Sequence, residues 1–197
     1  MHRTIFTTPV VNTFLRKLST TFLKLNGWKV EGVLPTQATK CVFIAAPHTS
    51  NWDLPYTLMV AFALRLNIYW MGKASIFNFP FGSLMRWLGG IAVNREQSNN
   101  LVAASAEALR AAEGSVQLVI PPEGTRSKTR YWKTGFYYIA LEAGVPILMT
   151  YMDYSTKTSG IGPMLHPTGD IEKDMQTVKA FYAPFKGKNA DQFASEN

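Results

Sequence analysis

The 197-residue chain is 47% hydrophobic, which is enough to bury one sizeable core, and no Pro/Gly/Ser-rich or charge-run linker divides it. Its single cysteine excludes an internal disulfide and fits a reducing compartment, and its three scattered histidines, His2, His48 and His166, show no metal-ligand spacing. The net charge of +7 predicts an anionic partner, either nucleic acid or a membrane surface.

The N-terminal region has a cationic amphipathic pattern. Five cations precede the first acid, Glu31: Arg3, Arg16, Lys17, Lys24 and Lys29. A helix is predicted over residues 10–25, because apolar side chains recur at helical spacing at Val11, Phe14, Leu15, Leu18, Phe22 and Leu25. Such a helix can lie in a bilayer interface or pack its stripe on its own domain, and the pattern is compatible with both. We expect residues 1–40 to form an N-terminal amphipathic helical arm.

The rest of the chain alternates strand and helix patterns. Strands are predicted at 41–46, 67–71, 91–93, 116–120 and 147–152, and helices at 54–66, 80–88, 99–113 and 134–143. This alternation predicts one α/β domain over residues 41–197, with a mostly parallel or mixed central sheet flanked by helices. Residues 152–170 are rich in Gly, Pro and Ser and are predicted as loop with at most one short strand. The polar tail from Lys186 onward is expected to fray.

A histidine and an aspartate stand five residues apart after the first predicted strand. His48 falls on the loop that leaves the apolar run 41–46, and Asp53 falls at the start of the next helix. The two side chains can meet, and an imidazole that donates one ring N–H to a carboxylate has its other nitrogen free to take a proton from a hydroxyl. The spacing also fits an Asp that caps the helix and a His bonded to loop backbone.

A second motif, Ile120-Pro121-Pro122-Glu123-Gly124-Thr125-Arg126-Ser127, follows the apolar run 116–120. Together with His48-x4-Asp53 it resembles the glycerolipid acyltransferases, the family that includes 1-acylglycerol-3-phosphate acyltransferase and is marked by His-x4-Asp and Pro-Glu-Gly-Thr-Arg. Two shorter blocks stand in the family order, Gly89-Gly90-Ile91-Ala92-Val93-Asn94-Arg95 and Gly144-Val145-Pro146-Ile147. The resemblance covers residues 41–150.

The resemblance implies transfer of a fatty acyl group from a thioester, on coenzyme A or acyl carrier protein, to a hydroxyl of a lysophospholipid such as 1-acylglycerol-3-phosphate. His48 would act as the general base and Asp53 would hold its tautomer. A thioester is already activated, so neither Ser50 nor Ser127 is required as a nucleophile. No metal and no resident cofactor is expected, since the acyl thioester is a co-substrate.

The expected substrate-binding residues are Lys73, Arg95, Glu123, Gly124, Thr125 and Arg126. Arg95 and Arg126 carry forked donors that suit a phosphate, and Lys73 stands where family members often place a basic phosphate contact. Backbone N–H groups around Gly124 are expected to face the developing oxyanion. Glu123 is expected to orient Arg126 or to receive a glycerol hydroxyl, unless it forms a structural ion pair within its loop.

Other acceptors and another class of protein stay open. A lyso-aminolipid or a sterol-like or polyketide alcohol fits the same chemistry, and a noncatalytic anionic-lipid-binding protein would keep the fold and the basic surface. Nucleic acid is not expected, because the cations follow no nucleic-acid motif. No stretch reaches the roughly 18 to 20 apolar residues of a spanning helix, and the N-terminus lacks a signal-peptide pattern. We therefore expect peripheral or monotopic contact with the cytoplasmic face of an anionic membrane.

Overall fold

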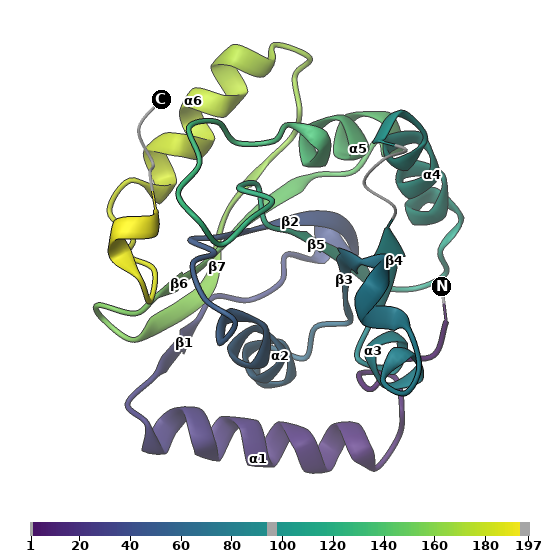
Figure 1. The fold of residues 1–197 in the computed structure, drawn as a ribbon, viewed down its shortest axis with the longest axis vertical. Coiled ribbons are helices and arrows are strands. Elements are labelled where there is room, and N and C mark those ends of the chain that lie inside the picture. Colours follow the sequence, from purple (N-terminus) through teal and green to yellow (C-terminus); the bar gives the residue numbers. More distant parts are fainter. Residues whose placement is uncertain (1, 94–97, 194–197) are drawn as a thin grey trace.

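A seven-stranded sheet forms the centre of the computed structural model, which describes residues 2–93 and 98–193 (Figure 1). Its strands are β1 (Lys29–Glu31), β2 (Lys40–Ala46), β3 (Ile68–Lys73), β4 (Gly90–Val93), β5 (Val116–Ile120), β6 (Ile147–Asp153) and β7 (Thr158–Leu165), in the order β1-β7-β6-β2-β5-β3-β4. The strands from β6 to β4 are parallel. At the other edge β7 pairs antiparallel with β6, and β1 pairs parallel with β7. The expected α/β fold with a mixed sheet is confirmed.

Helices cover both faces of the sheet (Figure 1). They are α1 (Val11–Leu25), α2 (Asp53–Ala63) and α3 (Gly82–Trp87) on one face, and α4 (Ser98–Ala111), α5 (Gly135–Ala143) and α6 (Ile171–Tyr182) on the other. Short 3₁₀ turns lie at Thr36–Ala38, Ala74–Phe77 and Ala190–Gln192. The helices and strands predicted from the sequence are all present, with their ends shifted by at most three residues.

The central strands are apolar throughout because they are buried on both faces. In β2, Val42 and Ile44 pack toward α5 and α6, whereas Cys41 and Phe43 pack toward α1 and α2. Successive side chains of a strand point to opposite faces, so a strand inside a covered parallel sheet reads as a continuous apolar run. The same burial directs the carboxyl end of β2, and the loop after it, to one edge of the sheet.

Helix α1 uses its apolar residues in two directions. Leu23 is buried, and Val11 and Leu15 pack on the core that includes α2. Phe14 and Leu18 remain exposed, as do Phe22 and Leu25. The sequence left open whether the apolar residues of this helix pack on the domain or face a partner. In the structure one side of the helix packs on the domain, and the other side is available to a partner.

Three parts of the fold differ from the sequence-based expectations. The edge strand β1 and the helix α6 were not predicted, and β7 is an eight-residue strand where loop with at most one short strand was expected. The glycines that suggested a loop are required by packing: a Cβ at Gly160 would collide with the backbone of Glu31, and a Cβ at Gly162 with the ring of Phe181. Gly in a strand often marks such a close approach.

The expectation of a frayed C-terminal tail is wrong as far as residue 193, where the description ends. The backbone N–H of Tyr154 donates to the carbonyl of Lys186 at 3.0 Å, and the side chain of Asn189 donates to the carbonyl of Thr49 at 2.8 Å. The polar composition of this segment serves hydrogen bonds to the rest of the domain.

Candidate active site

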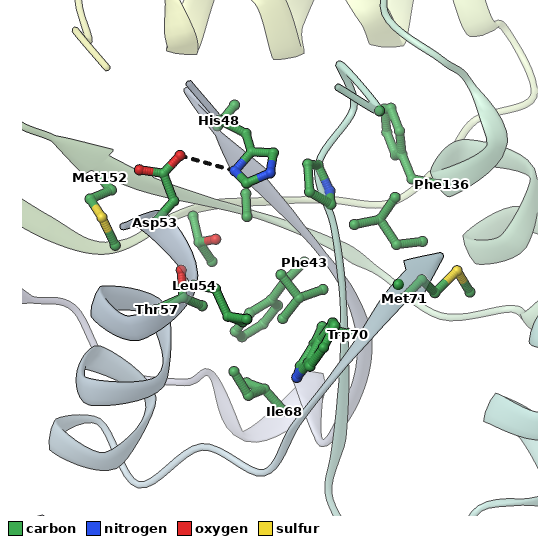
Figure 2. A pocket seen from close by; sticks show the side chains of 18 of the residues that line it. Phe43, His48, Asp53, Leu54, Thr57, Ile68, Trp70, Met71, Phe136 and Met152 are labelled. Atoms are coloured by element: carbon green, nitrogen blue, oxygen red, sulfur yellow. Dashed lines mark hydrogen bonds and ion pairs between the residues drawn. The ribbon is translucent and has the colours of Figure 1, made fainter. Parts of the chain in front are cut away.

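His48 and Asp53 meet at the carboxyl end of β2. Nδ1 of His48 lies 3.0 Å from Oδ2 of Asp53, and Figure 2 shows the second ring nitrogen turned away from the carboxylate. The same oxygen accepts the backbone N–H groups of Thr49 and Ser50, each at 2.9 Å. The loop therefore winds around a carboxylate at the N-terminus of α2, where a negative charge is favourable. His48 contacts that carboxylate through its ring, in the arrangement that a general base requires.

A residue far away in sequence completes the surroundings of Asp53. The hydroxyl of Tyr154, in the turn after β6, donates to Oδ1 of Asp53 at 2.8 Å. Sequence analysis did not single out Tyr154, because it stands 101 positions after Asp53 and belongs to no motif.

A cavity of about 780 Å³ lies beside the pair. Its inner wall is apolar and comes from β2, β3 and α2, through Phe43, Leu54, Ala61, Ile68 and Trp70. Figure 2 labels Phe43, Leu54, Ile68 and Trp70 among them. Its exposed lining includes three cations, Lys73, Arg126 and Lys133. The structure thus brings most of the predicted site residues to one cavity: His48, Asp53, Lys73, Gly124, Thr125 and Arg126.

Glu123 lies behind this cavity, and its observed contacts differ from those expected. Its Oε1 accepts the backbone N–H of His48 at 2.9 Å, and within the described residues it forms no ion pair. It therefore neither orients Arg126 nor makes an ion pair within its loop. Because Glu123 is only 5% exposed, burial raises the pKa of its carboxyl from 4.5 to about 7. Its role in the structure is to hold the backbone of the His48 loop.

The loop after β5 makes a tight turn at Gly124. This residue has φ +63°, and its N–H donates to the carbonyl of Pro121 at 3.2 Å. The side chain of Lys133 crosses over it, so that a Cβ at Gly124 would lie 2.8 Å from Cδ of Lys133. The positive φ favours glycine at this turn, because other residues adopt it only with strain. Lys133 is thereby placed beside Arg126 in the cavity lining, a position that no motif of the sequence indicated.

The C-terminal segment joins the two motif loops. The N–H of Asn189 donates to Oγ1 of Thr49 at 3.2 Å. Gln192, with its amide nitrogen turned toward the site, donates to the carbonyls of Thr49 at 3.2 Å and Arg126 at 2.6 Å. The segment thus fixes the loop of His48 relative to the loop of Arg126.

One expected site residue cannot be placed in the structure. Arg95 lies outside the described residues. Within residues 2–93 and 98–193, no three His, Cys, Asp or Glu side chains gather as metal ligands, and none of the helices is long and apolar enough to cross a bilayer.

The raised pKa of Glu123 predicts a distinct pH dependence of stability. Between about pH 4.5 and pH 7 the folded protein keeps Glu123 protonated, whereas the unfolded chain has lost this proton. The wild type should therefore lose stability as the pH rises through this window. The full loss is on the order of 3 kcal/mol. The glutamine of Glu123→Gln cannot ionise, and it keeps an oxygen that can accept the N–H of His48. The stability of this variant should therefore not fall between pH 4.5 and pH 7.

Thermal unfolding from pH 4.5 to pH 8 tests this prediction, with Glu113→Gln, which alters an exposed carboxylate, as the matched control. The Tm difference between Glu123→Gln and wild type should grow in favour of the variant as the pH rises. Parallel curves for the two proteins would mean that Glu123 does not titrate in this window.

Comparison with known proteins identifies the family. A protein-family model described as Acyltransferase matches residues 27–153. The 1-acyl-sn-glycerol-3-phosphate acyltransferase of Haemophilus influenzae is 30% identical over 134 residues, which are 63% of this chain and 53% of that protein. The enzymes of the same name from Salmonella typhimurium and Escherichia coli K12 are each 31% identical, over 63% of this chain and 52% of theirs. The chain thus spans about half the length of the curated relatives it matches.

A solved structure shares the fold. The crystal structure of the 1-acyl-sn-glycerophosphate (LPA) acyltransferase PlsC from Thermotoga maritima aligns with a TM-score of 0.59 at 18% identity, over 90% of this chain and 82% of that one. The family match spans both sequence motifs and the strands that carry them. The chain therefore belongs to the glycerolipid acyltransferase family.

Proposed function

We propose that the protein transfers a fatty acyl group from an acyl thioester, of coenzyme A or acyl carrier protein, to the hydroxyl of a lysophospholipid such as 1-acylglycerol-3-phosphate. The observation that carries the proposal is the His48–Asp53 pair beside a cavity with an apolar wall and a cationic lining. The names of the curated relatives support the same acceptor class.

His48 supplies the proton transfers of this reaction. With Nδ1 engaged by Asp53, the second ring nitrogen accepts the proton of the acceptor hydroxyl as its oxygen attacks the thioester carbonyl. The imidazolium that forms is stabilised by the carboxylate of Asp53. When the tetrahedral intermediate collapses, the carbon–sulfur bond breaks and the departing thiolate takes the proton from His48. The enzyme returns to its starting state without a covalent intermediate.

Serine has another role in the loop. Oγ of Ser50 accepts the backbone N–H of Trp52 at 3.2 Å, a bond that shapes the turn into α2. This contact supports direct transfer to the acceptor over a route through an acyl-serine.

The apolar wall suits the acyl chain. Between α2 and the sheet the cavity is bounded by buried aliphatic and aromatic side chains, among them Phe43, Ala61 and Ile68. Its volume of about 780 Å³ lies in the range of small-molecule sites, roughly 300–1,000 Å³. Burial of each methylene of the chain contributes about 0.8 kcal/mol. The hydrocarbon would thus lie beneath α2, with its carbonyl carbon near His48.

The cations suit the charged part of the substrates. Lys73 is the last residue of β3, and Arg126 and Lys133 belong to the loop after β5, so the three come together only in the folded chain. The guanidinium of Arg126 can bind a phosphate in a bidentate manner, and each lysine adds a point charge. We include Arg95 in this group from the sequence motif alone.

The helical layer that contains α1 is proposed to face an anionic membrane, on its cytoplasmic side. Residues 1–30 and 54–95 carry cations but no Asp or Glu. These segments supply α1, α3 and, apart from Asp53, all of α2. On the outside of α1, Phe14 is 65% exposed and Leu18 is 54% exposed, beside the exposed Lys17. An apolar ridge among cations is typical of helices that lie in the interface of anionic lipid.

The first prediction concerns the base. His48→Ala should lower the rate of acyl transfer by about 10²–10⁴-fold, and Asp53→Asn should be nearly as harmful, because an amide can leave His48 in the wrong tautomer. His166→Ala, which alters an exposed histidine outside the cavity, is the control. Each protein is incubated with acyl thioesters of coenzyme A or acyl carrier protein and with a panel of lysolipids. The acylated products are identified by mass spectrometry. Near wild-type turnover by folded His48→Ala would end the enzymatic proposal in favour of a lipid-binding protein.

A second prediction separates acceptor binding from catalysis. Arg126→Ala should raise KM for a phosphate-bearing lysolipid by about 10-fold or more, because a hydrogen bond to a charged group contributes about 1.5–3 kcal/mol. It should change KM for a neutral acceptor little. Arg130→Ala, four residues along the same loop and outside the cavity lining, should affect neither. Equal losses on both acceptors would assign Arg126 a structural role.

A third prediction concerns lipid binding by α1. Deletion of residues 1–25 would also remove the buried Ile5, Phe6 and Leu23, so point variants on the outer side are the better test. Lys17→Glu should weaken binding to anionic vesicles and reduce its salt sensitivity, since each cation near such a surface contributes about 1 kcal/mol. Phe14→Ser with Leu18→Ser should weaken binding even at high salt.

The control for this experiment is Leu141→Ser, which alters an exposed apolar side chain of α5 on the other face of the sheet. Vesicle sedimentation of the variants at low and high salt provides the measurement. If Leu141→Ser weakens binding as much as the α1 variants do, α1 is not the membrane contact.

A further inference from the structure

The two oxygens of Asp53 are held unequally. Oδ2 accepts three hydrogen bonds, from Nδ1 of His48 and from the backbone of Thr49 and Ser50. Oδ1 accepts one, from the hydroxyl of Tyr154 at 2.8 Å. The side chain of Asp53 is only 8% exposed, so bulk water offers little substitute for that donor. An unsatisfied buried carboxylate oxygen is costly, and the group would rotate or shift to recover a donor.

Tyr154 is held rigidly where it donates. Its N–H bonds to the carbonyl of Lys186 at 3.0 Å, and the preceding Asp153 accepts the hydroxyls of Ser155 and Thr156, each at 2.7 Å. Its ring packs edge-on against Trp28, with the ring centres 5.1 Å apart, and against Tyr56 at 5.9 Å. The tight turn and the aromatic contacts leave the phenol little freedom to move away from Asp53.

The phenol also remains a donor across the working pH range. Burial, followed by the negative charge of Asp53, raises the pKa of Tyr154 well above its ordinary value of 10. Titratable groups near Tyr154 and Asp53 include His48, Glu123, whose side chain bonds to the backbone of His48, and Tyr56, whose ring packs on Tyr154.

We infer that Tyr154 is a positioning residue for the His48–Asp53 pair: by holding Oδ1 it keeps Oδ2 directed at Nδ1 of His48. The proton then stays on Nδ1, and the second ring nitrogen stays available as the base. The catalytic part of this inference rests on the proposed function. Its structural part, the control of the His48 tautomer, can be tested whether or not the protein transfers acyl groups.

The tautomer is measured first, by ¹⁵N NMR of the histidine side chains in the unliganded protein. The chain has only three histidines, so the His48 signals can be assigned with His48→Ala. In wild type His48 should be mainly the Nδ1–H tautomer, and in Tyr154→Phe the proton should be shared between both nitrogens. Tyr56→Phe is the control, because Tyr56 packs against Tyr154 and its hydroxyl makes no hydrogen bond within the described residues. This variant should leave the His48 spectrum unchanged. An unchanged His48 spectrum in Tyr154→Phe would overturn the inference.

Kinetics test the catalytic part. Tyr154→Phe should lower kcat by about 10- to 100-fold with little change in KM, the effect of losing a hydrogen bond to a charged group. In a His48→Ala background the same substitution should have almost no further effect, because Tyr154 acts through His48. The positioning role would be refuted if Tyr154→Phe lowered kcat by the same factor with and without His48. It would also be refuted if Tyr154→Phe left the kcat of an otherwise wild-type, active enzyme unchanged. If wild type itself transfers no acyl group, the proposed function fails, and the NMR result still decides the role of Tyr154 in the pair.

Discussion

The buried carboxylate of Asp53 organises the site. Four donors from two parts of the chain converge on it: the His48 ring and two N–H groups of the same loop, and the hydroxyl of Tyr154. The five-residue spacing from His48 to Asp53 has a physical reason, since it allows the loop to leave β2, close around the carboxylate and enter α2. A carboxylate in this position is stabilised both by the donors and by the N-terminus of the helix. The imidazole is oriented as a consequence of how the loop satisfies that charge.

A second buried carboxyl group lies on the other side of His48 in a different environment. Glu123 accepts the N–H of His48 through one oxygen, while the other has no partner within the described residues. With so few donors, burial dominates and raises the pKa of Glu123 to about 7. The two carboxyl groups beside His48 thus differ because donors surround Asp53, whereas Glu123 has few.

Much of the fold and part of the site could be predicted because the signals are local. The strand and helix patterns, the His48–Asp53 spacing and the Pro-Glu-Gly-Thr-Arg motif each depend on neighbours within a few residues. What escaped prediction depends on contacts between distant segments. Tyr154 reaches Asp53 from the turn after β6, and Asn189 reaches Thr49 from the C-terminal segment. The glycines of β7 mark close packing, which in a single sequence has the same signature as a loop.

Helix α2 connects the proposed membrane contact with the proposed chemistry. Its first residue is Asp53, its inner side lines the cavity through Leu54 and Ala61, and its outer side carries α1 through the packing of Leu23 against Val60. The exposed side of α1, the apolar cavity and Asp53, the partner of His48, are therefore all joined through α2. Under the proposed function, lipid bound along α1 would lie a single helix layer away from the cavity that receives the acyl chain. The cations at the carboxyl ends of β3 and β5 would then meet the charged headgroup where the apolar cavity ends, and under the proposed function the fold would order hydrocarbon, reacting carbonyl and phosphate along one direction.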